Sequence, residues 1–136
     1  MRKNPAQKRI YSTEYDEQVA VMDFCRRKGS PYNKVMVSMS GNIIFYNNFP
    51  LIKRLALCGA IGTSEYPDGK GRPDMTWLVA RKGYHFLAIE LKLNEKAKLT
   101  PEERAYLEWC NSEGGYALRA NGADEAIKII QDYLEG

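Results

Sequence analysis

Two short apolar segments with charged residues at their outer ends constrain the fold of this chain most strongly. The first covers residues 75–79 and the second covers residues 84–91. Between them, residues 81–83 (Arg-Lys-Gly) provide a turn that ends in a glycine, which tolerates a positive φ angle. Two strand-like segments separated by such a turn predict an antiparallel β-hairpin.

The hairpin would bring three charged side chains together. Side chains alternate between the two faces of a strand, so Glu90 and Lys92 share one face, while Ile89 and Leu91 point to the other. Asp74 enters the first strand, and pairing across the hairpin would place its carboxylate near Glu90. Mg²⁺ prefers such oxygen ligands, and an adjacent ammonium can orient an attacking water or stabilise charge on a phosphate. The pattern predicts a divalent-metal site; the alternative is an ordinary strand that follows a turn.

These residues belong to an ordered set of motifs along most of the chain. Gly-Arg-Pro-Asp at 71–74, Glu-Leu-Lys at 90–92 and Leu-Thr-Pro-Glu-Glu at 99–103 resemble the VRR-NUC branch of the PD-(D/E)XK nucleases. Residues 13–18 resemble the first helix of that family, and residues 115–117 with the closing helix resemble its last strand and helix, so the similarity spans about residues 14–134. The family usually has Gln where this chain has Glu103, and a carboxylate cannot donate a hydrogen bond as an amide does.

The resemblance implies an α/β fold with a restriction-endonuclease-like core, in which α-helices flank a central mixed β-sheet. It also implies a metal-dependent DNA endonuclease that hydrolyses phosphodiester bonds in branched DNA, as Holliday-junction resolvases do. Similar small stand-alone proteins are often phage products that act as homodimers. The site residues that it implies are the Mg²⁺ or Mn²⁺ ligands Asp74, Glu90 and Leu91 (through its carbonyl), the water-orienting Lys92, the acidic Glu14, and the supporting Gln18 and Glu103.

Helices are expected on both sides of the hairpin. Ser12 or Thr13 can cap a helix that ends near Gly29, and a buried stripe is predicted at helical spacing. That stripe consists of Tyr15, Val19, Met22 and Cys25. Its first-turn acids offer a purely structural role for Glu14, because acids are favourable at a helix N-terminus. A second helix starts at the Thr100 cap and runs to about Glu113, so a capping box is the structural alternative for Glu103. Its predicted buried face is Ala105, Tyr106, Trp109 and Cys110.

The remaining elements complete a mixed α/β order. Residues 34–48 are rich in strand formers and are divided by a turn at 40–42, which predicts one or two strands. A short helix is expected at 51–60, and a glycine-rich loop at 59–71 leads into the proposed site. Residues 116–118 predict a strand, and the last helix follows Gly122.

Positive charge is concentrated near the N-terminus. The net charge is +3, but residues 1–10 alone carry +4, which leaves −1 for the rest. We interpret residues 1–12 as a basic arm that contacts phosphates and residues 13–136 as one nuclease-like domain; a solubilising tail is the alternative for the arm. The predicted nucleic-acid contacts are Arg2, Lys3, Lys8, Arg9, Lys53, Arg54, Lys70 and Arg72.

Composition excludes several classes of protein. The sequence has no apolar run long enough for a membrane span, and no apolar segment follows its N-terminal charges. We therefore expect a cytoplasmic protein without a membrane partner. If the protein is phage-encoded, the cytoplasm is that of the bacterial host. Three separated cysteines and a single histidine predict packed thiols rather than a zinc centre, and no nucleotide cofactor is expected.

Apolar segments at 35–39, 43–46 and 51–57 could form the interface of a homodimer or simply belong to the core. Two alternatives to the nuclease also stay open. One is a non-catalytic nucleic-acid-binding module that retains the fold. The other is a structural or partner-binding domain in which the motifs are coincidental.

Overall fold

The computed structural model describes residues 13–39, 42–45 and 71–135. The predicted helix at 51–60, most of the loop at 59–71 and the basic arm therefore lie outside the described residues. The helices and strands in chain order are α2 (Glu14–Lys28), β1 (Val35–Met39), β2 (Asn42–Phe45), β3 (Met75–Trp77), β4 (Leu87–Lys92), α4 (Pro101–Ser112), β5 (Tyr116–Asn121) and α5 (Ala123–Glu135).

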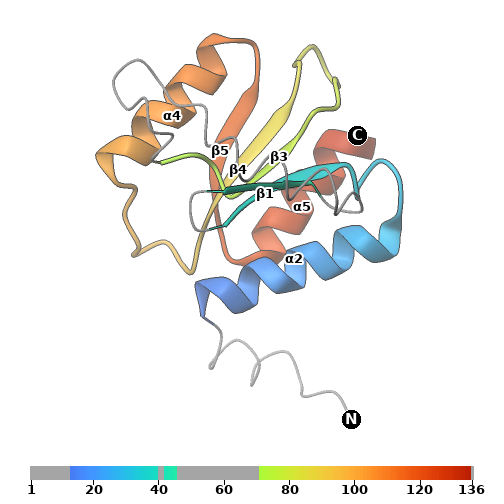
Figure 1. Ribbon diagram of the computed structural model, residues 1–136, viewed down its shortest axis with the longest axis horizontal. Coiled ribbons are helices and arrows are strands. Elements are labelled where there is room, and N and C mark those ends of the chain that lie inside the picture. Colours follow the sequence, from blue (N-terminus) through green and yellow to red (C-terminus); the bar gives the residue numbers. More distant parts are fainter. Residues whose placement is uncertain (1–12, 40–41, 46–70, 136) are drawn as a thin grey trace.

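The strands form a mixed sheet between two layers of helix. Its described strands follow the order β2-β1-β3-β4-β5, with antiparallel pairing from β2 to β4 and parallel pairing of β4 with β5. Parallel neighbours need a crossover connection, and α4 supplies it. The α4 helix lies on one side of the strands and α2 and α5 on the other (Figure 1). This arrangement confirms the predicted α/β, restriction-endonuclease-like fold.

The predicted hairpin is present as the β3–β4 pair. Met75 lies opposite Ile89 and Trp77 opposite Leu87, and an isolated bridge joins Arg81 to Tyr84 beyond the strands. The turn residues Lys82 and Gly83 have φ angles of 55° and 86°, the positive values that a tight two-residue hairpin turn requires. Every residue of β4 is buried, because helices cover both faces of this central strand.

The face of α2 that packs against the core differs from the predicted stripe. Tyr15 is 60% exposed and Val19 is 46% exposed, so the prediction was wrong for both. The prediction is confirmed for Cys25, and Met22 is partly buried. The buried residues of α2 are Glu17, Val21 and Cys25, spaced four apart. The pattern misled because an acid, Glu17, occupies a core position and two apolar side chains lie at the surface.

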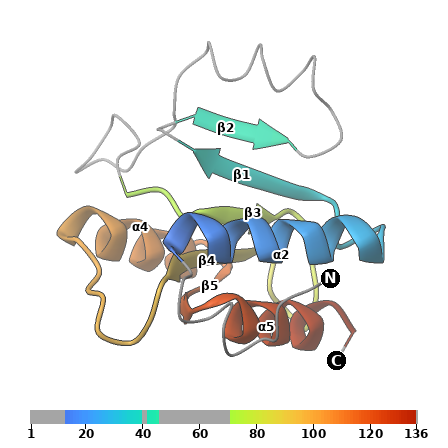
Figure 2. The same cartoon turned by 90° about the horizontal axis from the view of Figure 1, so that it is seen from below.

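Glu17 is buried because its carboxylate accepts a hydrogen bond from a backbone N–H at the start of another helix. Its Oε1 accepts a hydrogen bond of 2.7 Å from the backbone N–H of Ala123, the first residue of α5. The residue before α5 is Gly122, which has no side chain to cap that helix. The carboxylate from α2 thus acts as the missing cap, and α2 and α5 lie side by side (Figure 2).

The α4 helix begins as the sequence predicts. Thr100 and Glu103 form the full capping box, and Tyr106, Leu107 and Cys110 are buried. Trp109, expected on the buried face, is 38% exposed. The chain before β3 runs against this N-terminus, where a Cβ on Gly71 would collide with the backbone of Glu102. Gly71 also has a φ angle of +87°, so glycine is required for the approach that brings the following residues to the sheet.

The remaining core contains two packed thiols. Cys25 and Cys110 are buried and form no disulfide among the described residues, and burial raises the pKa of these thiols to about 12 and about 11. This agrees with the prediction for both; Cys58 lies outside the described residues. No helix in the described part of the chain is long and apolar enough to cross a bilayer.

Candidate metal centre

Three carboxylates converge where α2, β3 and β4 meet. Glu14, Asp74 and Glu90 each offer one oxygen, and these oxygens all lie within 4.8 Å of one another. The β3–β4 register explains part of this geometry, because Met75 opposite Ile89 puts Asp74 opposite Glu90. Glu14 is the first residue of α2 and is exposed, whereas Glu90 is buried. The cluster therefore extends from the interior to the surface, and it contains the three acidic residues that the family resemblance implies.

Asp74 is held in place by the strand that it faces. Its Oδ2 accepts a hydrogen bond of 2.7 Å from the backbone N–H of Leu91. Burial raises the pKa of Asp74 to about 6; the negative charges of Glu14 and Glu103 add to this shift, while the Leu91 N–H opposes it. The backbone thus orients a carboxylate that its surroundings make reluctant to ionise.

Glu90 has the more unfavourable position for a charge. Glu90 is only 2% exposed. Burial raises the pKa of Glu90 far above its usual range, and the adjacent carboxylate of Asp74 raises it further. Two carboxyl groups so close together cannot both ionise without compensation. A bound cation would provide that compensation.

The three carboxylates fit a small divalent cation. Mg²⁺ is bound by oxygen ligands at about 2.0–2.1 Å in octahedral geometry, so any two of its ligands lie between about 3 and 4 Å apart. The three carboxylate oxygens lie within 4.8 Å of one another, which is close to this range. Carboxylate oxygens also suit Mn²⁺.

Lys92 lies beside the cluster as an ammonium. Its Nζ donates a hydrogen bond of 2.8 Å to Glu103 Oε1 and lies 3.8 Å from Glu90 Oε2. Burial alone would lower the pKa of Lys92, but the hydrogen bond to Glu103 and the surrounding carboxylates raise it overall. In the metal-free cluster Lys92 is therefore held as an ammonium that donates a hydrogen bond to Glu103.

Glu103 serves two partners at once. Its Oε1 accepts from Lys92 and also from the backbone N–H of Thr100, at 2.9 Å. Burial would raise the pKa of Glu103, but the hydrogen bonds from Lys92 and Thr100 outweigh it, and the pKa is lowered. The capping role and a role at the site are thus both present. A Gln here could accept the same hydrogen bonds through its carbonyl oxygen but would not add a negative charge beside Lys92.

The structure does not place every predicted residue at the cluster. The amide nitrogen of Gln18 is buried without a hydrogen-bond partner among the described residues, so it does not bind the carboxylates. Leu91 contributes its N–H, and metal binding by its carbonyl stays a prediction. Arg72 is partly buried near Tyr106. The other predicted nucleic-acid contacts lie outside the described residues: Arg2, Lys3, Lys8, Arg9, Lys53, Arg54 and Lys70.

Sequence reasoning missed Arg119 in β5. This residue lies opposite Glu90 in the parallel β4–β5 register, so the two share a face of the sheet. Its Nε donates to Asn121 Oδ1 at 2.9 Å, and its Nη2 donates to the Asn94 carbonyl at 3.1 Å. These contacts hold the positive charge of Arg119 on the strand next to Glu90. Its isolated position in the sequence gives no signal for this, because only the strand register reveals it.

The fold, the carboxylate cluster and the similarity to a solved structure together support a nuclease-family α/β domain. A solved structure of a VRR_NUC domain protein is similar with a TM-score of 0.67 and 26% sequence identity. The similarity covers 91% of this chain and 89% of that one. It supports membership of the VRR-NUC family. No protein-family model matches the chain, and no curated protein matches it significantly.

Proposed function

We propose that the protein is a Mg²⁺- or Mn²⁺-dependent endonuclease that hydrolyses DNA phosphodiester bonds. The observation that carries the proposal is the convergence of Glu14, Asp74 and Glu90 within 4.8 Å, with the Lys92 ammonium 3.8 Å from Glu90. The similarity to a VRR_NUC domain protein agrees with this chemistry.

Each residue then has a defined task. Asp74 and Glu90 would hold the cation, and Glu14 would complete the acidic cluster from its exposed side. When bound, the cation would stabilise charge on the phosphate and lower the pKa of a water molecule. Lys92 donates hydrogen bonds to the attacking water or to the phosphate, which stabilises charge that develops in the transition state.

The surrounding residues position these groups. The Leu91 N–H holds the Asp74 carboxylate, and Glu103 anchors Lys92. Arg119 adds a cation with donors suited to a phosphate on the same sheet face as Glu90.

The substrate and assembly follow from the family resemblance. We propose branched DNA such as a four-way junction as the substrate and a homodimer as the acting species, because two symmetric cuts need two sites. We further propose a basic arm at residues 1–12, a nuclease domain at residues 13–136 and action in the cytoplasm. Light scattering tests the dimer, because the mass of one chain is 15.5 kDa.

Cleavage of a panel of labelled duplexes, flaps and four-way junctions tests the activity. The protein should cut with Mg²⁺ or Mn²⁺ and not with EDTA, and Asp74→Asn should be inactive under the same conditions. Absence of cleavage on every DNA with either ion would contradict the proposal.

The Lys92–Glu103 ion pair favours one alternative, a nucleic-acid-binding module without catalysis. An ion pair of this kind competes for the ammonium that the reaction would use. The same panel decides between the two functions, because a module of this kind would bind DNA without cutting it.

A further inference from the structure

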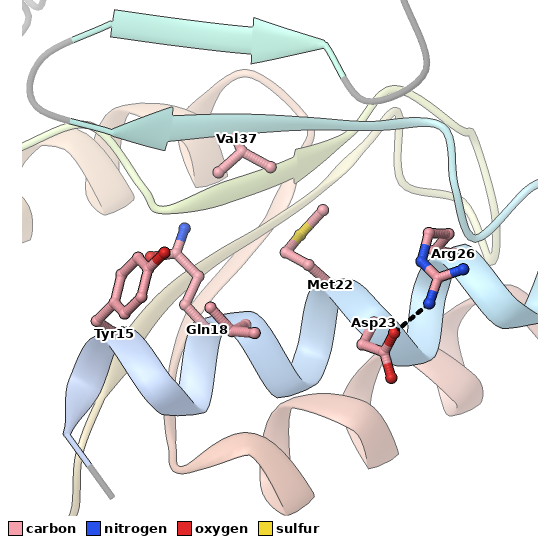
Figure 3. Close-up of a pocket in the computed structure, with 7 residues that line it drawn as sticks. Tyr15, Gln18, Met22, Asp23, Arg26 and Val37 are labelled. Atoms are coloured by element: carbon pink, nitrogen blue, oxygen red, sulfur yellow. Dashed lines mark hydrogen bonds and ion pairs between the residues drawn. The ribbon is translucent and has the colours of Figure 1, made fainter.

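A groove lies between α2 and β1, on the side of the helix that faces the edge of the sheet. It has a volume of about 230 Å³, and its lining includes Tyr15, Gln18, Val19, Met22 and Val37. Figure 3 shows the side chains of Gln18 and Met22 rising from α2 towards Val37 on β1. Tyr15 and Val19, which lie at the surface of α2, therefore line this groove together with Met22, which also packs against the core.

The groove lies next to the acidic cluster. Glu14 belongs to the cluster, Tyr15 follows it in the sequence, and Gln18 lies one helical turn further along α2. A nucleic acid with a phosphate at the cluster would therefore have its neighbouring nucleotide beside the groove.

The chemistry of the groove suits a neutral, planar group. Tyr15 is 60% exposed and Val19 is 46% exposed, so an aromatic ring and an aliphatic side chain face solvent together. The Gln18 amide nitrogen is buried and has no hydrogen-bond partner among the described residues. A buried donor of this kind is unfavourable unless a partner supplies an acceptor.

The charge and the size of the groove restrict further which ligand it can bind. Asp23 and Arg26 at the other end of the groove pair with each other, so the groove offers no uncompensated charge from them to a phosphate. The volume of about 230 Å³ is also below the roughly 300–1,000 Å³ of sites that enclose a drug-sized ligand. A single ring system with hydrogen-bond acceptors on its edge fits these properties.

We propose that the groove binds one unpaired nucleobase of the substrate, next to the phosphate at the acidic cluster. The base stacks on Tyr15, and its edge accepts a hydrogen bond from the Gln18 amide. Stacking on an aromatic side chain needs a base that is free of its duplex. The groove would thus favour DNA with unpaired nucleotides at the cut. This inference rests on the proposed nuclease function.

The test uses three DNA probes that differ only beside the cutting site. One is a blunt duplex, the second carries a single-stranded flap, and the third carries the same flap with abasic nucleotides, which keep the phosphates but lack the bases. Binding is measured by fluorescence anisotropy in EDTA, so that no probe is cut. The wild-type protein should bind the normal flap about tenfold more tightly than the abasic flap.

Tyr15→Ala should abolish this tenfold preference, and Tyr15→Phe, which keeps the ring, should retain it. Tyr15 is mostly exposed, so both variants are expected to fold, and thermal melting checks this. Gln18→Leu should weaken binding of the normal flap and leave binding of the abasic flap unchanged. Leu78→Ala is the matched control, because Leu78 is uncharged, is 63% exposed and does not line the groove.

Two failures can be told apart. If the protein cuts DNA but Tyr15→Ala keeps the full preference for the normal flap, the base-binding groove is wrong and the nuclease proposal stands. If the protein cuts no DNA of the panel above with Mg²⁺ or Mn²⁺ and binds none of the three probes, both proposals are wrong.

Discussion

Two glutamates with the same burial have opposite surroundings. Glu17 and Glu90 are each 2% exposed. Glu17 accepts a hydrogen bond from the first N–H of α5, where the helix dipole favours a negative charge. Glu90 faces the carboxylate of Asp74, which raises its pKa. The first glutamate therefore has a partner that stabilises its charge, whereas the second lies where ionisation is unfavourable, as expected for the proposed cation ligand. Burial alone does not distinguish a structural carboxylate from a functional one; the partners do.

The largest difference between the two glutamates should appear in catalysis. Glu90→Gln is expected to lower the single-turnover rate of DNA cleavage at least a hundredfold, about 2.7 kcal/mol, because it removes a metal ligand. Glu17→Gln should stay within tenfold of the wild type, since its amide oxygen can still accept the hydrogen bond from α5. Titration with Mn²⁺ by calorimetry should show the same contrast. Equal losses of activity in the two variants would contradict the assignment of roles.

The next largest effect is expected in stability, from a substitution of Glu17. Glu17→Ala is expected to lower the free energy of unfolding by about 2 kcal/mol, because it leaves the start of α5 without a cap. Urea denaturation measures this difference. Glu125→Ala is the matched control, because Glu125 is exposed on the first turn of α5 and should change stability by no more than about 0.5 kcal/mol. Loss of less than that from Glu17→Ala would mean that water replaces the cap.

Substitution of Glu90 should raise the free energy of unfolding, whereas substitution of Glu17 lowers it. Folding raises the pKa of Asp74 from 3.8 to about 6 and also raises that of Glu90, so the folded protein retains protons that the unfolded chain releases. The stability of the metal-free protein should therefore fall as pH rises past the usual carboxyl range. Glu90→Gln removes much of this penalty and should be about 1 kcal/mol more stable than the wild type at pH 7 in EDTA.

The pH dependence provides the control for that prediction. Near pH 4 the carboxyls of Asp74 and Glu90 are largely protonated in the folded state, because their pKa values are raised, and the advantage of Glu90→Gln should nearly disappear. Thermal melts in EDTA at the two pH values measure the change. A variant that is less stable than the wild type at pH 7 would show that Glu90 has a stabilising partner that outweighs Asp74.

The same contrast explains how much could be predicted from the sequence. The β3–β4 hairpin, the α4 capping box and the meeting of Asp74 with Glu90 depend on residues close in sequence, where strand alternation and turn chemistry decide the geometry. The bond from Glu17 to Ala123 joins residues 106 positions apart, so no local pattern reveals it. Arg119 likewise reaches the site edge only through the parallel pairing of β4 with β5.

The exposed residues of α2 show a second limit of prediction from the sequence. Its apolar spacing predicts burial for Tyr15 and Val19, but these residues line a surface groove. Hydrophobic periodicity identifies an apolar face of a helix and cannot say whether the protein core or a ligand covers it.

Glu103 should give the smallest effect, because it combines the two roles that Glu17 and Glu90 perform separately. It caps α4 through Thr100 and anchors the Lys92 ammonium. Glu103→Gln keeps an acceptor for both partners and restores the residue usual in the VRR-NUC family, so stability should change by less than about 0.5 kcal/mol and cleavage by less than tenfold. Glu103→Ala removes both acceptors and should lower stability by about 1 kcal/mol, as loss of a capping interaction does, and should reduce the cleavage rate further. Urea denaturation and single-turnover cleavage of both variants separate the two roles. If Glu103→Gln alone lowers cleavage a hundredfold at unchanged stability, the negative charge beside Lys92 is itself required, and the site depends on a carboxylate at the position where the VRR-NUC family that the sequence resembles usually has Gln.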